Sequence, residues 1–325
     1  MIGGRSVAHV TFGGRAICKM PCFCVVSTTE HDRDLARAEL WALSGVNSFA
    51  RVVTVPRAVD VEHAAYVTVC AEELAAGPSL SALSEALAQR RPHFERFHIT
   101  LVTLPPRPQV GSHAAIVEAA RFVTGTVDAE HPLIELLLVG QEGEWRLGQI
   151  VSRASKTYFA HEQKPHGFSS ALPARVARAM VNLGAKPGDT VIDPCCGVGT
   201  ILLEAWAAGA RAVGGELNRK LAGLTQANLR HFGRPPWVCI ADACRPWARA
   251  DVVVTDFPYG RQCARDPQLY ERLLAALPGF APRLVVVTAE DLGERLEQAG
   301  YEVLQAADVV KSHGFRRRVT LAQVR

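Results

Sequence analysis

The chain has 325 residues, a mass of 35.2 kDa and a formal net charge of +4, and 48% of its residues are hydrophobic. This length predicts two domains, and the composition is that of an ordinary globular protein. The mild charge does not by itself establish a polyanionic partner, and without a run of about eighteen apolar residues we expect no contact with a membrane.

The cysteines and the first residues argue against a secreted, disulfide-bonded domain. Nine cysteines, an odd number, follow no disulfide framework. No pair of CxxC motifs indicates zinc, so we expect no metal site. Cys18, Cys22 and Cys24 lie close together and are interpreted as small core or strand residues. Arg5 and Arg15 interrupt the stretch in which a signal peptide would need its apolar core, so the expected location is the cytoplasm.

Arginine supplies most of the positive charge. Only six of the 36 basic residues are lysine, and the planar arginine fork suits phosphate and stacks on bases. A GC-rich genome explains the excess equally well, so the clustering of basic residues carries more information. One polar stretch holds Arg153, Lys156, His161, Lys164 and His166, and another holds Arg316, Arg317 and Arg318. These residues are candidate RNA contacts, although a solvated surface accounts equally well for any one of them.

The N-terminal part of the chain predicts two small α+β units. The first has strands over residues 22–26, 52–55 and 66–69 and helices over 27–43 and 79–89. The second has strands over 97–104, 133–139 and 145–151 and a helix over 112–123. A turn at Gly140-Gln141-Glu142-Gly143 pairs the last two strands. We therefore divide this part into a ferredoxin-like region over 1–95 and a second region over 96–153.

From about Leu172 strands and helices alternate. Strands are predicted over 190–193, 212–216, 237–241, 252–256, 284–288, 302–307 and 319–324, and helices over 173–183, 200–208, 219–231, 267–276 and 291–299. This alternation indicates an α/β fold with a mostly parallel seven-stranded sheet, covered on both faces, that binds ligands at the carboxyl ends of its strands. The final two strands form a hairpin, which leaves the last strand antiparallel. The domain spans 172–325, after a linker over 154–171.

A glycine turn follows the first strand of this domain, in the sequence Asp193-Pro194-Cys195-Cys196-Gly197-Val198-Gly199-Thr200. The third glycine of a dinucleotide-binding GxGxxG turn would fall at Leu202, so the nicotinamide fingerprint fails. Asp193 stands ahead of the turn, where a carboxylate repels a pyrophosphate and attracts a cofactor that has an ammonium group and no phosphate. S-adenosylmethionine fits that description.

Acidic residues also end the next two strands. Glu216 can accept both ribose hydroxyls, and Asp242 can accept the adenine amino group. A lone acid at a strand end is more often a helix cap, but acids at the first three strand ends together favour a cofactor site. The predicted cofactor-binding residues are Asp193, Cys195, Gly197, Gly199, Thr200, Glu216, Leu217, Asp242, Ala243 and Asp256.

The fourth strand ends in Asp256-Phe257-Pro258-Tyr259, and these four are the predicted catalytic residues. An exocyclic amine is a poor nucleophile because its lone pair is delocalised into the ring. The Asp256 carboxylate and the Phe257 carbonyl can each accept one N–H, which aligns the nitrogen with the sulfonium methyl. Asp256 can also take the released proton, and Tyr259 can stack on a flipped base. The alternative is a simple turn in which proline ends the strand and tyrosine packs on the core.

The segment from about Ser169 to Arg325 resembles the tRNA guanine-N2 methyltransferases that carry an N-terminal THUMP RNA-binding domain. The resemblance rests on LPARVARAMVNLGAKPGDTVIDPCCGVGTILLEA and TDFPYG, where family members often have DPFCGTGTILIEA and DPPYG. It implies a Rossmann-like, class I S-adenosylmethionine-dependent methyltransferase domain. The departures are Cys195-Cys196 for an aromatic residue and cysteine, and Phe257 for the first proline. Phe257 brings a free N–H and a bulkier side chain to the pocket.

The N-terminal half is similar to a THUMP domain in the order of its segments. FHITLVTLPPR, the helix over 112–123, VDAEHPLIELLLV and WRLGQIVSR carry this resemblance, which places the THUMP-like RNA-binding region at 96–153. The chain length is similar to that of the compact archaeal-type enzymes that methylate guanosine at position ten of tRNA. The resemblance implies that the N-terminal half binds the acceptor end of tRNA and that the product is N2-methylguanosine or its dimethyl form.

Several alternatives stay open. An acid at the position of Asp256 is common for guanine N2 and asparagine for adenine N6, with exceptions in both classes, so an adenine-N6 methyltransferase acting on RNA or DNA is the nearest competitor. The intact acids argue against a catalytically inactive RNA-binding homologue, and Leu202 argues against a dinucleotide oxidoreductase. The sequence does not indicate the oligomeric state or an activating protein subunit.

Overall fold

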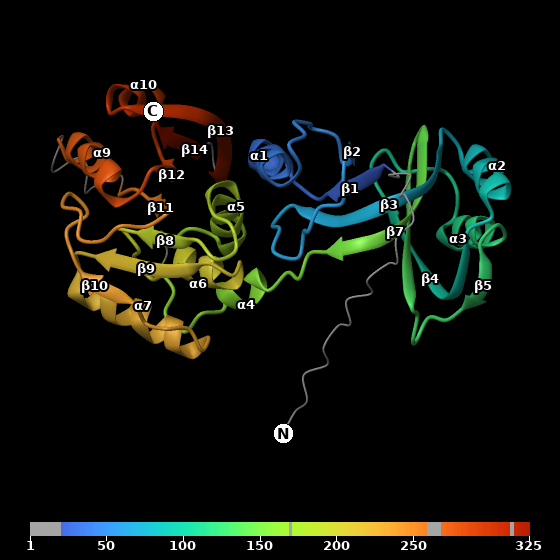
Figure 1. Cartoon of the computed structure of the whole chain (residues 1–325), viewed down its shortest axis with the longest axis horizontal. Helices are drawn as coiled ribbons and strands as arrows, with labels where there is room; N and C mark the ends of the chain where they lie inside the picture. Colours follow the sequence, from blue (N-terminus) through green and yellow to red (C-terminus); the bar gives the residue numbers. More distant parts are fainter. Residues whose placement is uncertain (1–20, 169–170, 259–267, 313–314) are drawn as a thin grey trace, which may run out of the picture.

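Two sheets of seven strands each, joined by a short connecting segment, form the two halves of the molecule (Figure 1). The computed structural model describes residues 21–168, 171–258, 268–312 and 315–325. Within these ranges, no helix combines the length and the apolar character that crossing a bilayer requires.

The N-terminal sheet has the strand order β2-β1-β3-β7-β6-β4-β5. Its strands are β1 (Cys22–Val26), β2 (Val52–Val55), β3 (Val67–Gly77), β4 (His93–Thr103), β5 (Thr124–Val127), β6 (Ile134–Gln141) and β7 (Glu144–Arg153). Its helices are α1 (Arg33–Ser44), which follows a 3-10 turn η1 (Glu30–Asp32), α2 (Leu80–Arg90) and α3 (Ser112–Ala120). α2 and α3 pack together over the half of the sheet that holds β4 and β5, and α1 lies at the opposite end (Figure 1).

The two predicted α+β units share this single sheet. β3 of the first unit pairs antiparallel with β7 of the second, from Val69 opposite Arg153 to Gly77 opposite Trp145. The predicted division between residues 95 and 96 falls inside β4. β5 was absent from the predicted elements because all four of its residues are exposed, and a strand with no buried residue shows no apolar alternation.

β1 contributes to a core on each face of its sheet. Cys22 and Cys24 face the core shared with α1, whereas Phe23 and Val25 belong to a second cluster on the opposite face. All five residues of β1 are buried, which is typical of a strand covered on both sides. Cys22 and Cys24 are therefore core residues, as predicted, and Cys18 lies outside the described residues.

The C-terminal sheet has the order β10-β9-β8-β11-β12-β14-β13. Its strands are β8 (Thr190–Asp193), β9 (Arg211–Glu216), β10 (Val238–Ile240), β11 (Val252–Asp256), β12 (Arg283–Thr288), β13 (Tyr301–Ser312) and β14 (Phe315–Val324). The pairs among β8 to β12 are parallel, and β14 is antiparallel to both of its neighbours. The predicted seven-stranded Rossmann-like sheet with an antiparallel last strand is confirmed.

Helices cover both faces of this sheet. The side chains of β11 point alternately to the two faces and show which helices cover each. The helices are α4 (Tyr158–Glu162), α5 (Ala174–Gly184), α6 (Thr200–Ala207), α7 (Arg219–His231), α9 (Leu269–Phe280) and α10 (Gly293–Gln298). Val252 and Val254 belong to the cluster that holds residues of α5, α6 and α7. Val253 belongs to the cluster on the other face, with residues of α9 and α10. This division leaves the carboxyl ends of the strands open.

Glu39 of α1 ties the two halves together, because α1 packs against α5 and β13. The Glu39 side chain is fully buried. Its carboxylate accepts the backbone N–H groups of Ala65 and Tyr66, each at 2.7 Å, and of Val67 at 3.2 Å. It also accepts Nδ2 of Asn182 from α5 at 2.8 Å. A single carboxylate thus satisfies four donors at the junction.

We predict that Glu39→Ala lowers the free energy of unfolding by about 3 kcal/mol or more, since it leaves several buried N–H groups without an acceptor. Chemical denaturation measures this change. Glu30→Ala is the matched control, because the Glu30 side chain is 83% exposed and its loss should change stability by less than about 0.5 kcal/mol. Equal stability of the two variants would contradict this role for Glu39.

Candidate active site

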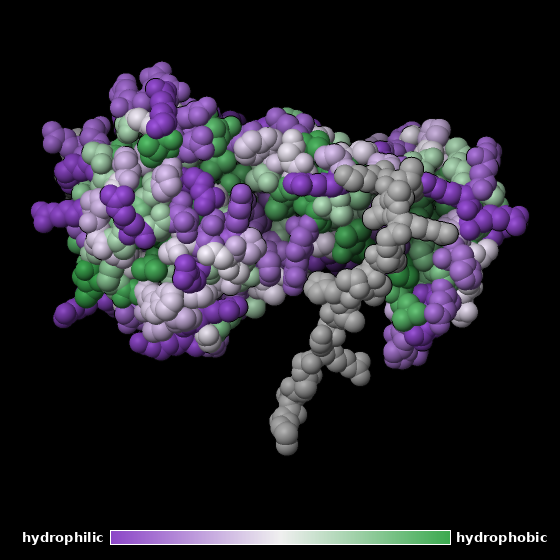
Figure 2. All heavy atoms as spheres, in the orientation of Figure 1, coloured by the Kyte–Doolittle hydropathy of each residue, from purple (hydrophilic) through white to green (hydrophobic). Residues whose placement is uncertain are grey.

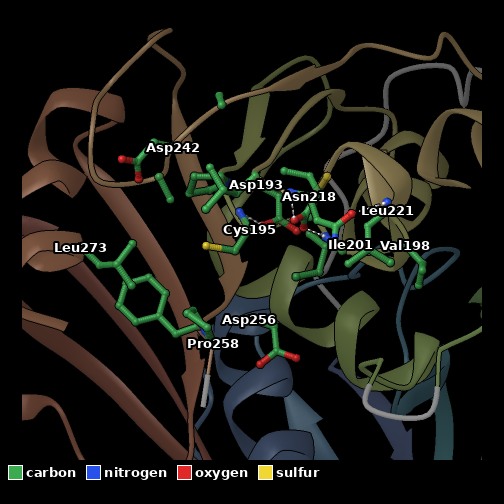
Figure 3. A pocket seen from close by; sticks show the side chains of 18 of the residues that line it. Asp193, Cys195, Val198, Ile201, Asn218, Leu221, Asp242, Asp256, Pro258 and Leu273 are labelled. Atoms are coloured by element: carbon green, nitrogen blue, oxygen red, sulfur yellow. Dashed lines mark hydrogen bonds between the residues drawn. The ribbon is translucent and has the colours of Figure 1, made fainter. Parts of the chain in front are cut away.

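A cavity of about 1360 Å³ lies at the carboxyl ends of the strands of the C-terminal sheet. Figure 3 shows Asp193, Asn218 and Ile201 gathered on one side and Asp242 and Leu273 on the other. Open parallel sheets bind their ligands at this edge. The predicted site residues that line the cavity are Asp193, Cys195, Gly197, Thr200, Glu216, Leu217, Asp242, Ala243, Asp256, Phe257 and Pro258.

The two glycines of the turn have different roles. Gly197 has φ of 53° and Gly199 has φ of 85°, a region that favours glycine. A Cβ added at Gly197 would meet open space, and Gly197 itself lines the cavity. A Cβ at Gly199 would lie 2.6 Å from Cγ2 of Thr225 in α7. Gly199 is absent from the cavity lining, so its close approach to α7 explains the glycine better than a cofactor contact does.

The inner face of α7 holds the glycine turn in place. Thr225 Oγ1 donates to the carbonyl of Gly197. Asn228 is fully buried, and its Nδ2 donates to the carbonyls of Val198 and His166, both at 2.9 Å. Its Oδ1 accepts the N–H of His166 at 3.0 Å. Asn228 therefore joins the turn to the segment before α5, a role for which the sequence carries no motif.

The carboxylates at the strand ends have unequal environments. Asp193 is 1% exposed and accepts Thr255 Oγ1 at 2.8 Å and the Cys195 N–H at 3.1 Å. Burial, together with the nearby Asp256 and Glu216 carboxylates, raises the pKa of Asp193 to about 7. A cation bound beside Asp193 would relieve this cost. The predicted attraction for an ammonium group thus has a physical basis in the structure.

Glu216 and Asp242, the acids predicted to bind the ribose and the adenine, can accept further hydrogen bonds. Glu216 accepts the N–H groups of Gly197 at 3.0 Å and Asn218 at 2.8 Å. Asp242, which follows β10, accepts the N–H of Cys244 at 2.9 Å. A carboxylate has about four acceptor positions, so Glu216 and Asp242 can still accept ribose hydroxyls and an adenine amino group.

Thr200 provides an independent test of whether S-adenosylmethionine fits. Its hydroxyl is buried and has no hydrogen-bond partner among the described residues, yet the residue lines the cavity. Thr200 is also the first residue of α6, where N–H groups point outward and favour negative charge. A carboxylate near Thr200 and an ammonium near Asp193 are the two ends of an amino acid. The residues present therefore fit the methionine part of the cofactor.

Phe257, where the family usually has proline, uses the N–H that proline would lack. This N–H donates to the carbonyl of Val287 at 3.1 Å and continues the pairing of β11 with β12. The Phe257 ring is fully buried, and its centroid lies 5.8 Å from that of Tyr270 in α9. The departure from the family motif therefore fixes the turn after Asp256. Tyr259 lies outside the described residues.

Several lining residues were not predicted from the sequence. They are Phe168, Ala171 and Leu172 before α5, Asn218 and Leu221 at the start of α7, and Leu269, Arg272 and Leu273 of α9. Asn218 could have been found, because it follows Glu216 directly and caps the predicted helix over 219–231, where its side chain accepts the N–H of Lys220 at 2.9 Å. The α9 residues carry no such signal, since only folding brings that helix over the cavity.

Comparison with known families agrees with this geometry. Residues 162–311 match the UPF0020 family, described as RMKL-like, methyltransferase domain. The matched segment is slightly less than half of the chain, and over it the sequence is similar to a methyltransferase domain. The match begins in α4 and ends in β13, so it contains the whole cavity.

The chain is also similar to named RNA methyltransferases and to a solved structure. A tRNA (guanine(10)-N2)-dimethyltransferase from Methanothermobacter thermautotrophicus is 33% identical over 157 residues, 45% of this chain and 46% of that protein. The bovine U6 snRNA (guanine-N(2))-methyltransferase THUMPD2 is 31% identical over 102 residues, 29% of this chain and 20% of that protein. The crystal structure of TrmN from Thermus thermophilus is 22% identical, with a TM-score of 0.49 over 94% of this chain and 100% of that chain. This chain spans about half the length of the archaeal relative.

Part of the predicted RNA-contacting surface is buried in the methyltransferase domain. His161 and Lys164 are buried, and His161 Nδ1 lies 2.6 Å from Oε1 of the fully buried Glu204. Glu204 also accepts Arg178 Nε at 2.6 Å. The interpretation of His161 and Lys164 as RNA contacts is wrong, because their charge pattern reflects a buried network that fixes α4 on α5 and α6.

The second basic stretch divides in the same way. Arg317 is 2% exposed, and Arg318 pairs with Asp308 at 3.0 Å and Asp291 at 3.2 Å. Only Arg316 of the three is exposed. Alternation along β14 turns consecutive arginines to opposite faces of the sheet, so three adjacent arginines do not make a three-residue contact.

We predict that binding of S-adenosylmethionine weakens as pH falls through 7. Asp193 must be ionised to hold an ammonium group, and its pKa of about 7 means that binding releases a proton at low pH. The dissociation constant should rise about eightfold between pH 7.5 and pH 6, with most of the change below pH 7. Calorimetry measures this. Asp193→Asn should bind weakly with a flat pH profile, and a steep profile in that variant would contradict the assignment.

We predict that Phe257→Pro destabilises the methyltransferase domain even though it restores the usual family residue. It removes the bond to Val287 and a buried ring, a loss of about 3 kcal/mol or more in the free energy of unfolding. Phe257→Ala is the matched comparison, because it removes the ring and keeps the N–H. The proline variant should be less stable than the alanine variant by about 1 kcal/mol, and the reverse order in a denaturation series would argue against the hydrogen bond.

Proposed function

We propose that this protein uses S-adenosylmethionine to methylate the exocyclic N2 amine of a guanosine in tRNA, in the cytoplasm. One observation carries the proposal. The Asp256-Phe257-Pro258 turn at the end of β11 lines the same cavity as the carboxylates of Asp193 and Glu216 at the ends of the adjacent parallel strands. This common lining supports the assignment of a base-holding turn and a cofactor cradle to one cavity.

The cofactor supplies a methyl group on a positively charged sulfur. The residues of the chain orient the amine and accept its proton. The Asp256 carboxylate and the Phe257 carbonyl accept the two N–H groups of the amine, which localises the nitrogen lone pair for attack on the methyl carbon. When the nitrogen accepts the methyl group it would gain positive charge, and Asp256 would take the proton that the amine then releases. Phe257 is suited to this role because its own N–H is anchored on Val287.

The assignment to guanine N2 rests on Asp256 and on the relatives. Three archaeal relatives, from Methanothermobacter thermautotrophicus, Methanocaldococcus jannaschii and Pyrococcus abyssi, are named tRNA (guanine(10)-N2)-dimethyltransferases. Each is 30% to 33% identical to this chain over 157 to 168 residues. The bovine relative is named for guanine N2 of an snRNA. These names support an RNA guanine-N2 substrate, and the archaeal names favour tRNA. We also propose that the THUMP-like region over 96–153 helps to hold the RNA.

The deciding experiment is mass spectrometry of nucleosides. Bulk tRNA that lacks the modification is incubated with the protein and labelled cofactor, and is then digested. Labelled N2-methylguanosine or N2,N2-dimethylguanosine supports the proposal. N6-methyladenosine would reassign the base, and label in duplex DNA but not in tRNA would reassign the polymer. No label with any nucleic acid, together with normal cofactor binding, would indicate an inactive homologue.

We predict that Asp256→Ala lowers kcat by at least about a thousandfold, within the range for loss of an acid–base residue, while the dissociation constant for the cofactor changes less than about threefold. Asp193→Ala should instead raise the dissociation constant for the cofactor. Tritium transfer to tRNA measures the first quantity and calorimetry the second. Near-normal methyl transfer by Asp256→Ala would rule out this residue as the clamp.

A further inference from the structure

The outer face of α7 carries exposed basic side chains that form no ion pair within the described residues. α7 contains Arg219, Lys220, Arg230 and His231 and no acidic residue, and Arg234 lies three residues after its end. Arg219, Lys220 and Arg230 are exposed and Arg234 is half-buried. None of these side chains forms an ion pair with a residue in the described part of the chain. In Figure 1, α7 lies along the lower edge of the domain, with no element below it.

The spacing of these residues places them on one side of the helix. Lys220, Gly223, Ala227 and Arg230 recur at intervals of three and four, which is the period of one helix face, and Arg234 lies just beyond the end of the helix, after Gly233 with φ of 65°. A Cβ at Gly223 would meet open space, so nothing packs on the middle of this face. Lys220 and Arg230 are separated by about 15 Å along the axis, at about 1.5 Å per residue. We call Lys220, Arg230 and Arg234 the α7 ridge.

The ridge begins beside the cavity. Asn218 and Leu221, on either side of Lys220 and Arg219, line the cavity wall. The opposite face of the same helix carries Thr225 and Asn228, which hold the glycine turn. One helix therefore supports the cofactor cradle from its inner face and presents positive charge to solvent from its outer face.

The N-terminal half has the opposite charge. Residues 1–153 contain 13 arginines, one lysine and 16 acidic residues, a net charge of −2, whereas residues 154–325 have 22 basic and 16 acidic residues, a net charge of +6. Many of the N-terminal arginines are already paired. The pairs include Arg96 with Asp128, Arg121 with Glu118, Arg146 with Glu73 and Arg153 with Glu135. Figure 2 shows polar residues scattered over both halves rather than one large patch on the N-terminal half.

We infer that the α7 ridge binds phosphates of the RNA backbone and supplies more of the electrostatic attraction for RNA than the N-terminal half does. The inference rests on the proposed function for the identity of the polymer. RNA fits because phosphates repeat along a strand as the ridge charges repeat along the helix, and small residues between those charges allow a backbone to approach closely. Phosphate contacts set affinity and its salt dependence rather than base choice.

Two triple variants that remove the same charge test this inference. Lys220→Ala, Arg230→Ala and Arg234→Ala remove the ridge. Arg57→Ala, Arg91→Ala and Arg107→Ala remove three exposed arginines of the N-terminal half, none of which has an ion pair within the described residues. Fluorescence anisotropy of labelled tRNA between 50 and 200 mM KCl gives the dissociation constant and its salt slope, and calorimetry gives cofactor affinity.

The ridge variant should bind tRNA at least about tenfold more weakly, with a salt slope smaller by about 2 to 3, because about one unit is lost per phosphate contact. The N-terminal variant should lose less than about threefold. Cofactor affinity should stay within twofold in both, which also reports on folding of the methyltransferase domain. Arg230→Glu alone should weaken binding further than Arg230→Ala, and this pair decides the matter if the triple variant does not fold.

Unchanged tRNA affinity and salt slope in the ridge variants would overturn the inference. A larger loss in the N-terminal variant would also overturn it and would assign the attraction to that half. Because binding is measured without methyl transfer, these outcomes are independent of the nucleoside analysis. If the methylated product is a different nucleoside but the ridge variant still binds tRNA more weakly, the proposed function is rejected and the inference about the α7 ridge stands.

Discussion

Parallel pairing of β8 with β9 and β11 is the constraint on which the candidate active site depends. It brings Asp193 and Asp256, 63 positions apart in the sequence, to the same edge of one sheet. Glu216 joins them through the pairing of β9 with β8. Parallel strands all end on the same side, so acids at consecutive strand ends become neighbours without any local contact between their segments. An antiparallel arrangement would have sent alternate acids to opposite edges.

Concentrating carboxylates at one edge has an electrostatic cost that decides what the cavity can bind. Asp193 is both buried and close to Asp256 and Glu216, and each effect opposes its negative charge. A dinucleotide with two phosphates would add to that repulsion, whereas a ligand with a sulfonium and an ammonium group would reduce it. The same arrangement that excludes one large class of Rossmann cofactors therefore favours another. The hydroxyl of Thr200, which has no hydrogen-bond partner within the described part of the chain, gives the cavity one donor for the opposite end of such a ligand.

The cradle is held by elements that are distant from the chemistry. Asn228 links the carbonyl of Val198 to both backbone groups of His166, and the Glu204 network holds the preceding α4. The segment that enters the methyltransferase domain is thus fixed to the glycine turn before it reaches Phe168 and Leu172 at the cavity wall. Glu39 fixes the N-terminal half to α5 in a similar way. Arg178 and Asn182 both belong to α5, so this helix takes part in both connections.

The sequence by itself determined the alternation of strands and helices after Leu172, the strand ends that carry Asp193, Glu216 and Asp256, and the failure of a dinucleotide turn at Leu202. These follow from local periodicity and from residue chemistry at strand ends, which need no knowledge of distant contacts. Only the tertiary structure decided that His161, Lys164 and Arg317 are buried, that Gly199 faces α7 rather than the cavity, and that the Phe257 N–H pairs with Val287. It also joined the two predicted N-terminal units into one sheet. Burial and hydrogen bonding between remote segments depend on how the elements pack together, and the local pattern of a chain does not contain that packing.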